Sequence, residues 1–230
     1  MPPRAEEGAC PCGRPPALCV CPPAPIVDNR VAILVLQHPQ EQDRILGTAR
    51  LLVRTLRHCR LKVGLSWRNL AHALESGGTE QRQPDARQWG VLYLGSAKID
   101  EGSMSGAPLV AVDRNGEPLG DQTAALAGLA GVVVLDGNWA QAKALWWRNP
   151  WLTRLRRLVA VPDGPSLYGN LRREARRDAL STLEAVALTL SALEDDPGVR
   201  ERVLGPFREL LRRAKAAGIR DSKRDRRSRR

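Results

Sequence analysis

Asp136 is the residue of this chain best placed for acid–base chemistry, and it lies in the segment LDGNWAQAKALWWRNPW. It falls in the run GVVVLDG (131–137), the strongest strand pattern of the sequence, and a helical pattern follows. Ligands of α/β proteins bind at the carboxyl ends of such strands, where a carboxylate can accept a proton or hydrogen-bond a ligand. The same position also suits an Asp that caps the next helix, so both roles are open for Asp136.

The helical pattern after Asp136 concentrates tryptophan. The chain has six Trp, two Tyr and one Phe, and this segment holds Trp139, Trp146, Trp147 and Trp151. Trp139, Lys143, Trp146 and Trp147 stand at i, i+4, i+7 and i+8. They therefore share one broad side of a helix, and Pro150 ends that helix. We expect most of this aromatic stripe to pack the helix against the sheet. Trp139 is the exception, because the first turn lies near Asp136 and the expected ligand edge.

The stretch LSTLEA (180–185) predicts a second element of a site. Ser181 and Glu184 have the spacing of a capping box, in which each side chain bonds the other's backbone N–H at a helix start. The free N–H groups and the dipole of a helix N-terminus also attract a carboxylate. Ser181, Thr182 and Glu184 therefore either begin a helix only or also contact an anionic ligand.

Two turns after predicted strands add further candidates. His38 follows the first strand pattern, Pro39 fixes its turn, and the histidine either binds substrate or has a structural role. Leu94, Gly95 and Ser96 follow another strand pattern. Because glycine has no side chain, the backbone of this loop can approach a cofactor closely.

A basic run, YGNLRREARRDAL, precedes the capping box. It contains Tyr168 and four arginines, Arg172, Arg173, Arg176 and Arg177. Guanidinium groups contact phosphates and aromatic rings stack on unpaired bases, so the run is a candidate substrate-binding surface for RNA. A solvated surface is the alternative.

Four of the five cysteines lie in CPCGRPPALCVC, as Cys10, Cys12, Cys19 and Cys21. Four thiolates this close together can surround one tetrahedral Zn²⁺, which predicts a small structural zinc knuckle. Only one residue separates the first pair, where two are usual, and idle thiols are the alternative. Cys59 follows a helical pattern and is expected to be a small packing residue.

Strand and helix patterns alternate along the rest of the chain. Strands are expected within 31–37, 61–65, 91–96, 109–112, 131–137 and 156–161, and helices within 42–58, 68–76, 124–130, 139–147, 178–194 and 198–218. The continuous apolar strands predict burial on both faces. The sequence therefore predicts an α/β fold with a mainly parallel sheet flanked by helices.

The charge of the chain indicates a polyanionic partner. Lys and Arg number 36 against 25 Asp and Glu, an excess of 11, and the stretch from Arg220 onward carries seven basic and two acidic residues. A disordered basic end that only aids solubility is the alternative for that stretch. We expect a Cys-rich leader (1–25), one catalytic domain (26–218) and a disordered basic tail (219–230). No apolar run is long enough to span a membrane and no secretory signal is visible, so a cytoplasmic protein is expected.

Four stretches, in order, resemble the DTW-domain family. They are the cysteine cluster, LVLQHPQE (34–41), LDGNWAQAKALWWRNPWL (135–152) and LSTLEAVALTL (180–190), and the resemblance covers roughly residues 10 to 195. The family motif has Asp, a variable residue, Thr and Trp at a helix start. Asp136 and Trp139 match it, whereas Asn138 stands in place of the Thr and can replace its hydrogen bonds but not its hydroxyl chemistry.

The resemblance implies a function and a cofactor. The family transfers the 3-amino-3-carboxypropyl group of S-adenosylmethionine to N3 of a uridine in tRNA, with methylthioadenosine as the other product, and its fold is related to knotted α/β (SPOUT-like) methyltransferases. The implied partner is tRNA, and the implied role of Asp136 is either to take the N3 proton or to bind the donor. A non-catalytic RNA-binding protein and an S-adenosylmethionine-dependent RNA methyltransferase are the competing interpretations. The sequence does not indicate an oligomeric state.

Overall fold

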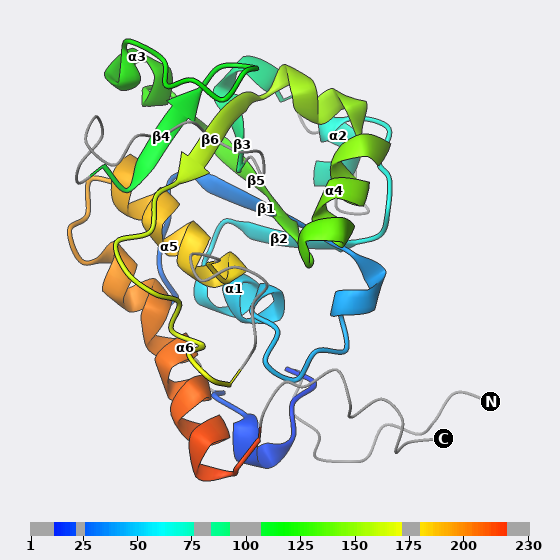
Figure 1. Ribbon diagram of the computed structural model, residues 1–230, viewed down its shortest axis with the longest axis vertical. Helices are drawn as coiled ribbons and strands as arrows, with labels where there is room; N and C mark the ends of the chain where they lie inside the picture. Colours follow the sequence, from blue (N-terminus) through cyan, green and yellow to red (C-terminus); the bar gives the residue numbers. More distant parts are fainter. Residues whose placement is uncertain (1–11, 22–25, 76–83, 93–106, 172–179, 220–230) are drawn as a thin grey trace.

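A six-stranded sheet forms the centre of the protein. The computed structural model describes residues 12–21, 26–75, 84–92, 107–171 and 180–219 (Figure 1). The strands are β1 (Ala32–Gln37), β2 (Cys59–Val63), β3 (Trp89–Leu92), β4 (Leu109–Val112), β5 (Gly131–Asp136) and β6 (Arg156–Ala160), in the order β2-β1-β5-β3-β6-β4. Every neighbouring pair is parallel except β4 and β6. This confirms the predicted α/β fold with a mainly parallel sheet.

Both faces of the sheet are covered, because its central strands are apolar on both sides. Along β1, Ile33 and Val35 belong to one hydrophobic cluster, whereas Leu34 and Leu36 belong to another. Successive side chains of a strand point to opposite faces, so the continuous apolar run builds two cores at once. Figure 1 shows α5 and α6 on one side of the sheet and α2 and α4 on the other.

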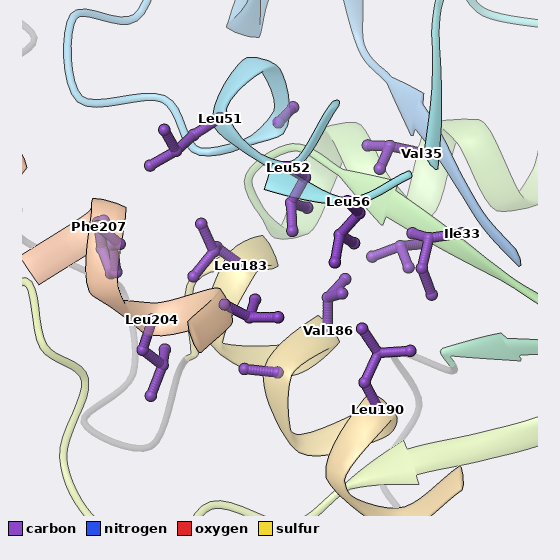
Figure 2. Packing of buried hydrophobic residues seen from close by; sticks show 14 of the residues in the cluster. Ile33, Val35, Leu51, Leu52, Leu56, Leu183, Val186, Leu190, Leu204 and Phe207 are labelled. Carbon is purple, nitrogen blue, oxygen red and sulfur yellow. The ribbon is translucent and has the colours of Figure 1, made fainter. Parts of the chain in front are cut away.

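Most of the helical residues of the larger core come from three helices on one face of the sheet. They are α1 (Ala49–Thr55), α5 (Thr182–Leu193) and α6 (Val199–Ala216). Figure 2 shows Leu52, Leu56 and Val186 meeting near Ile33, with Phe207 of α6 beyond them. Leu18, in the short 3-10 helix η1 (Pro16–Leu18), is fully buried in the same cluster, so this part of the cysteine-rich leader packs into the main core. Among the described helices, none has the length and apolarity that crossing a membrane requires.

The smaller core holds α2 (Leu70–Leu74), α4 (Trp139–Arg148) and η4 (Pro150–Arg154) against the opposite face. The side of α4 that meets the sheet carries Ala142 and Leu145. Trp147 is instead 71% exposed, and the expectation that the tryptophan stripe packs this helix is wrong for that residue. Trp146 is half-buried and Trp151 is buried. The helix therefore meets the sheet through Ala142 and Leu145, with Trp146 packed only partly against the same core.

The remaining elements are α3 (Gln122–Leu126), η2 (Pro39–Glu41) and η3 (Ala86–Gln88). One predicted helix is much shorter than its pattern. The helix expected over 42–58 is confined to α1, because the chain turns at Gly47 and leaves the helix at Leu56, which pairs with Val27 in an isolated bridge. Cys59 therefore begins β2, and its placement at the end of a helix was wrong.

Candidate active site at the carboxyl edge of the sheet

The candidate site is centred on Asp136, the last residue of β5. In the parallel register Asp136 lies beside Gln37, the last residue of β1. The Gln37 amide Nε2 donates to Asp136 Oδ2 over 2.7 Å, and the Thr182 hydroxyl donates to Asp136 Oδ1. The carboxylate is 9% exposed and is held from two elements, β1 and the first turn of α5. This arrangement fixes its orientation at the sheet edge.

Asn138, and not Asp136, caps α4. The Asn138 side-chain oxygen accepts from the Gln141 backbone N–H over 3.1 Å, and Gln141 Oε1 accepts from the Asn138 N–H over 2.7 Å, which completes a capping box. The helix-cap interpretation of Asp136 is therefore wrong, and its carboxylate is left for other partners. Asn138 fills the motif's Thr position with a side chain of the same capping ability.

The first turn of α5 combines a cap with a site contact. Ser181 and Glu184 form the predicted capping box, with Glu184 N–H donating to Ser181 Oγ over 3.1 Å and Ser181 N–H donating to Glu184 Oε2 over 2.9 Å. Glu184 also accepts from Ser166 Oγ over 2.8 Å and from Leu167 N–H over 2.7 Å. Ser181 and Glu184 are thus engaged with their own chain, and Thr182 is the residue of this turn that reaches Asp136.

His38 lies at the same edge, as its position after the first strand suggested. Its backbone N–H donates to the Asp136 carbonyl over 2.9 Å, and its Nδ1 accepts from the Gln40 N–H over 3.3 Å at the start of η2. The ring is half-buried. The second hydrogen bond uses one ring nitrogen as a helix cap, which turns the imidazole toward its own backbone.

Tyr168 lies in the core and not on a surface. Its side chain is 1% exposed, its hydroxyl donates to the Leu46 carbonyl over 2.7 Å, and its ring packs edge-on against Phe207 at 5.0 Å. The predicted contact between Tyr168 and RNA is therefore corrected to a packing role. Several predicted site residues lie outside the described residues, namely Leu94, Gly95, Ser96, Arg172, Arg173, Arg176 and Arg177.

Gln37 is a site residue that sequence reasoning missed. It is 2% exposed and is the polar end of an otherwise apolar strand, which is the signal that could have drawn attention to it. Its Nε2 binds Asp136, and among the described residues its Oε1 has no hydrogen-bond partner. A buried acceptor without a donor is costly, so this oxygen is suited to receive a donor from a ligand.

Three of the four clustered cysteines come together. The sulfur atoms of Cys12, Cys19 and Cys21 all lie within 4.8 Å of one another, and the Cys12 and Cys19 sulfurs are 3.7 Å apart. Sulfurs that share a tetrahedral zinc, with Zn–S bonds of about 2.3 Å, lie about 3.8 Å apart. The cluster could hold a metal ion, and Cys10 lies outside the described residues.

Arginines tie the cysteine cluster to the body of the protein. Arg14 donates from Nη2 to the Gly47 carbonyl over 2.6 Å, and Arg213 of α6 donates to the Cys19 carbonyl. Burial lowers the pKa of Arg14, whereas the nearby Cys12 and Tyr168 raise it. A guanidinium beside the sulfurs favours their thiolate form, which is the form in which cysteine binds a metal ion.

The fold and this edge define an α/β protein whose candidate ligand site lies where β1 and β5 end against a helix N-terminus. The chain belongs to the DTW domain family, whose model matches residues 9–215. It is 32% identical over 213 residues to tRNA-uridine aminocarboxypropyltransferase 2 of Drosophila melanogaster, covering 92% of this chain and 76% of that protein.

More distant relatives carry the same kind of name. The chain is 27% identical over 210 residues to tRNA-uridine aminocarboxypropyltransferase 2 of Mus musculus, covering 86% of this chain and 60% of that protein. It is 25% identical over 217 residues to tRNA-uridine aminocarboxypropyltransferase A of Arabidopsis thaliana, covering 87% of this chain and 78% of that protein. No solved structure was found to match the chain.

Proposed function

We propose that the protein transfers the 3-amino-3-carboxypropyl group of S-adenosylmethionine to N3 of a uridine in tRNA, with release of methylthioadenosine. Family membership and the names of the relatives support this reaction class. The single structural observation that supports it best is the carboxylate of Asp136, held by Gln37 and Thr182 at the ligand edge of the sheet.

Asp136 has capacity for a ligand beyond its contacts within the protein. A carboxylate accepts at about four positions, and the described residues occupy two of them. It can therefore take the proton that uracil N3 loses as its bond to carbon forms, or accept from the ammonium or ribose groups of the donor. The sulfonium of S-adenosylmethionine supplies an activated carbon, and it becomes a neutral thioether when that carbon leaves.

The buried Gln37 Oε1 fits the same ligand, because it can accept from an N–H or O–H group that the ligand brings to the edge. We assign the contacts with S-adenosylmethionine to Asp136, Trp139, Thr182 and the loop of Leu94, Gly95 and Ser96. Ser181 and Glu184 support these contacts by fixing the start of α5. His38 and the arginines at 172, 173, 176 and 177 remain our candidates for contacts to tRNA.

We further propose that Cys10, Cys12, Cys19 and Cys21 bind a structural zinc ion, with the three clustered sulfurs as support. The relation to knotted methyltransferases, the division at residues 25 and 218 and a cytosolic location are predictions of the same proposal. The proposed zinc ion is structural, and we assign it no role in the transfer reaction.

The decisive experiment incubates the protein with unmodified tRNA and S-adenosylmethionine labelled either in the aminocarboxypropyl chain or in the methyl group. Digested tRNA is then analysed for labelled nucleosides. Label from the chain but not from the methyl group supports the proposal. Methyl label would mean an RNA methyltransferase, and tRNA binding without either label would leave a non-catalytic RNA-binding protein.

Asp136→Ala and Asp136→Asn separate the two roles of the carboxylate. If Asp136 is the base, both variants lose transfer but still bind S-adenosylmethionine, because the amide of Asn is not basic. If it binds the donor, affinity for S-adenosylmethionine falls in both. Full activity in Asp136→Ala would remove this residue from the mechanism.

A further inference from the structure

The outward side of α4 presents aromatic rings to solvent. Trp139 is 51% exposed and Trp147 is 71% exposed, and Lys143 lies between them on the same side at i+4 and is also exposed. At 1.5 Å per residue, the two tryptophans are about 12 Å apart along the helix. Exposed tryptophan is unusual, since the ring buries a large apolar area when it packs. These three residues are called the α4 stripe below.

The segment after β2 also carries exposed apolar residues and is hydrogen-bonded to the end of α4. Val63 and Leu65 are 44% and 37% exposed, and the carbonyl of Leu65 accepts from the Asn149 side chain at the end of α4 over 3.0 Å. Ser66 also donates to the Arg148 carbonyl over 3.0 Å. Four of the six exposed large hydrophobic residues of the described chain thus belong to these two joined segments. Exposed apolar groups that gather in this way mark an interaction site.

The same two segments are free of acidic residues. Residues 137–162 contain five Lys and Arg and no Asp or Glu, and residues 59–74, which include β2 and α2, contain three Lys and Arg and no Asp or Glu. Lys143, Arg148 and Arg68 are exposed there. Rings interleaved with cations fit a strand that has both bases and phosphates, whereas an apolar protein partner would gain little from uncompensated positive charge.

The stripe also has a direction relative to the candidate site. Trp139 begins α4 three residues after Asp136, and Trp147 lies two turns further along this helix, which covers one side of the sheet (Figure 1). A strand stacked along the stripe would therefore lead toward the carboxyl edge where β1 and β5 end. The smaller core holds the inner side of α4 through Ala142 and Leu145, so the rings stand on a rigid element.

We propose that the α4 stripe is a stacking platform for unpaired bases of the RNA substrate, with Lys143 and Arg148 contacting the phosphates between them. The identification of that RNA as tRNA rests on the proposed function, whereas the stacking itself does not. Trp147 is a binding residue remote from the chemistry. Trp139, assigned above to S-adenosylmethionine, marks the end of the platform nearest Asp136, where the RNA would meet the donor.

The test measures binding of the full-length protein to fluorescein-labelled tRNA and to a short polyuridine strand, with an RNA duplex of equal length for comparison. Trp147→Ala should weaken binding of the polyuridine strand roughly 5- to 150-fold, the effect of losing one stacked base. Trp147→Phe should retain most of the affinity, and Trp147→Leu should not, because leucine keeps an apolar surface but has no aromatic face. Duplex binding should change little.

Ile26→Ala is the matched control, because Ile26 is 56% exposed and lies before β1, at the opposite end of that strand from Gln37. It should leave RNA binding unchanged. The proposal is overturned if Trp147→Ala binds polyuridine as the wild type does, or if Leu and Phe at this position behave alike. It is also overturned if light scattering shows that Trp147→Ala only separates a dimer.

Failure of the platform and failure of the proposed function are distinguishable. Loss of stacking is read from RNA binding without S-adenosylmethionine, whereas the transfer reaction is read from labelled tRNA. If the wild type transfers the label and Trp147→Ala binds polyuridine as tightly as the wild type, the proposed function stands and the stacking platform is refuted. If the wild type transfers no label but its binding of polyuridine depends on Trp147, the stacking platform stands and the proposed function is refuted.

Discussion

Gln37 and Asp136 are direct neighbours at the ends of two parallel strands, and the Gln37 amide donates to the Asp136 carboxylate over 2.7 Å. They are 99 residues apart in sequence. The side-chain contact forms only because β5 lies beside β1 in the sheet, and the backbone ladder sets its register. Thr182 completes the arrangement from α5. The orientation of the proposed working carboxylate is therefore a property of the sheet and one helix start together.

Gln37→Leu should lower kcat/KM for tRNA modification by roughly 5- to 150-fold, because a buried group left without a partner costs about 1–3 kcal/mol. The leucine removes the donor to Asp136 Oδ2 and keeps most of the volume. Gln37→Glu should be worse, since it places a second carboxylate beside the first. Steady-state kinetics measure the effect, with Gln88→Leu on the exposed η3 as the control. Unchanged kinetics in Gln37→Leu would exclude Gln37 from positioning Asp136.

Asn138→Thr should leave both stability and transfer activity nearly unchanged. The role of Asn138 in the structure is to cap α4, and Thr caps a helix almost as well. Asn138→Ala should lower the free energy of unfolding by about 1 kcal/mol, because it removes the acceptor for the Gln141 N–H. Urea denaturation and the labelled-tRNA assay measure the two effects. A large gain of activity in Asn138→Thr would mean that the family hydroxyl has a chemical role that Asn138 lacks.

Glu184→Gln should destabilise the protein by about 1–3 kcal/mol, because one buried carboxylate accepts three hydrogen bonds, from Ser166, Leu167 and Ser181. The amide has a single acceptor oxygen and would turn its N–H₂ group toward another donor. Glu201→Gln on the exposed side of α6 is the control and should cost less than about 1 kcal/mol. Thermal and urea unfolding give the comparison. Equal losses of stability in the two variants would show that the hydrogen bonds of Glu184 do not contribute to stability as predicted.

Sequence patterns predicted the parts of this architecture that depend on local order. The apolar runs identified β1 and β5, and the Ser181 and Glu184 spacing identified the start of α5. Because carboxyl ends of parallel strands share one edge, His38 and Asp136 were expected there together, and their backbones are joined by a hydrogen bond. The α4 stripe shows the limit of periodicity. It groups residues on one side of a helix but does not say which side faces the sheet, and Ala142 and Leu145 take that side.

Sequence patterns could not predict the contacts between segments that are distant in the chain. The pairing of Gln37 with Asp136 needs the strand order, which no local pattern contains. Tyr168 lies in an irregular segment beside arginines, so composition suggested a surface, whereas α6 supplies Phe207 as a packing partner. The Tyr168 hydroxyl donates to the carbonyl of Leu46, which lies in a loop distant in the sequence. Burial of this kind depends on which helices meet, and periodicity within one segment cannot report that.

Metal removal should loosen the leader and lower the melting temperature by several degrees, because Leu18 and the Arg213 contact tie the cysteine cluster to the main core. The isolated protein should contain one zinc ion per chain, and Cys12→Ser should reduce that content. Cys59→Ser is the control and should not, since Cys59 lies in β2 outside the cluster. Metal analysis and thermal unfolding with and without a chelator give the result. A metal-free protein of unchanged stability would argue for idle thiols.

Cys59 should resist alkylation until strongly alkaline pH. Burial raises the pKa of its thiol from 9.0 to about 12, so at pH 8 the reactive thiolate is roughly a thousandfold scarcer than for an ordinary cysteine. The folded state favours the protonated thiol, so this contribution to stability is complete below about pH 9 and is lost as the pH rises through 12. Mass spectrometry after iodoacetamide treatment across a pH series measures the rate, with the urea-unfolded chain as reference. Equal rates for Cys59 in the folded and unfolded chains at pH 8 would contradict the partial burial of Cys59 in β2.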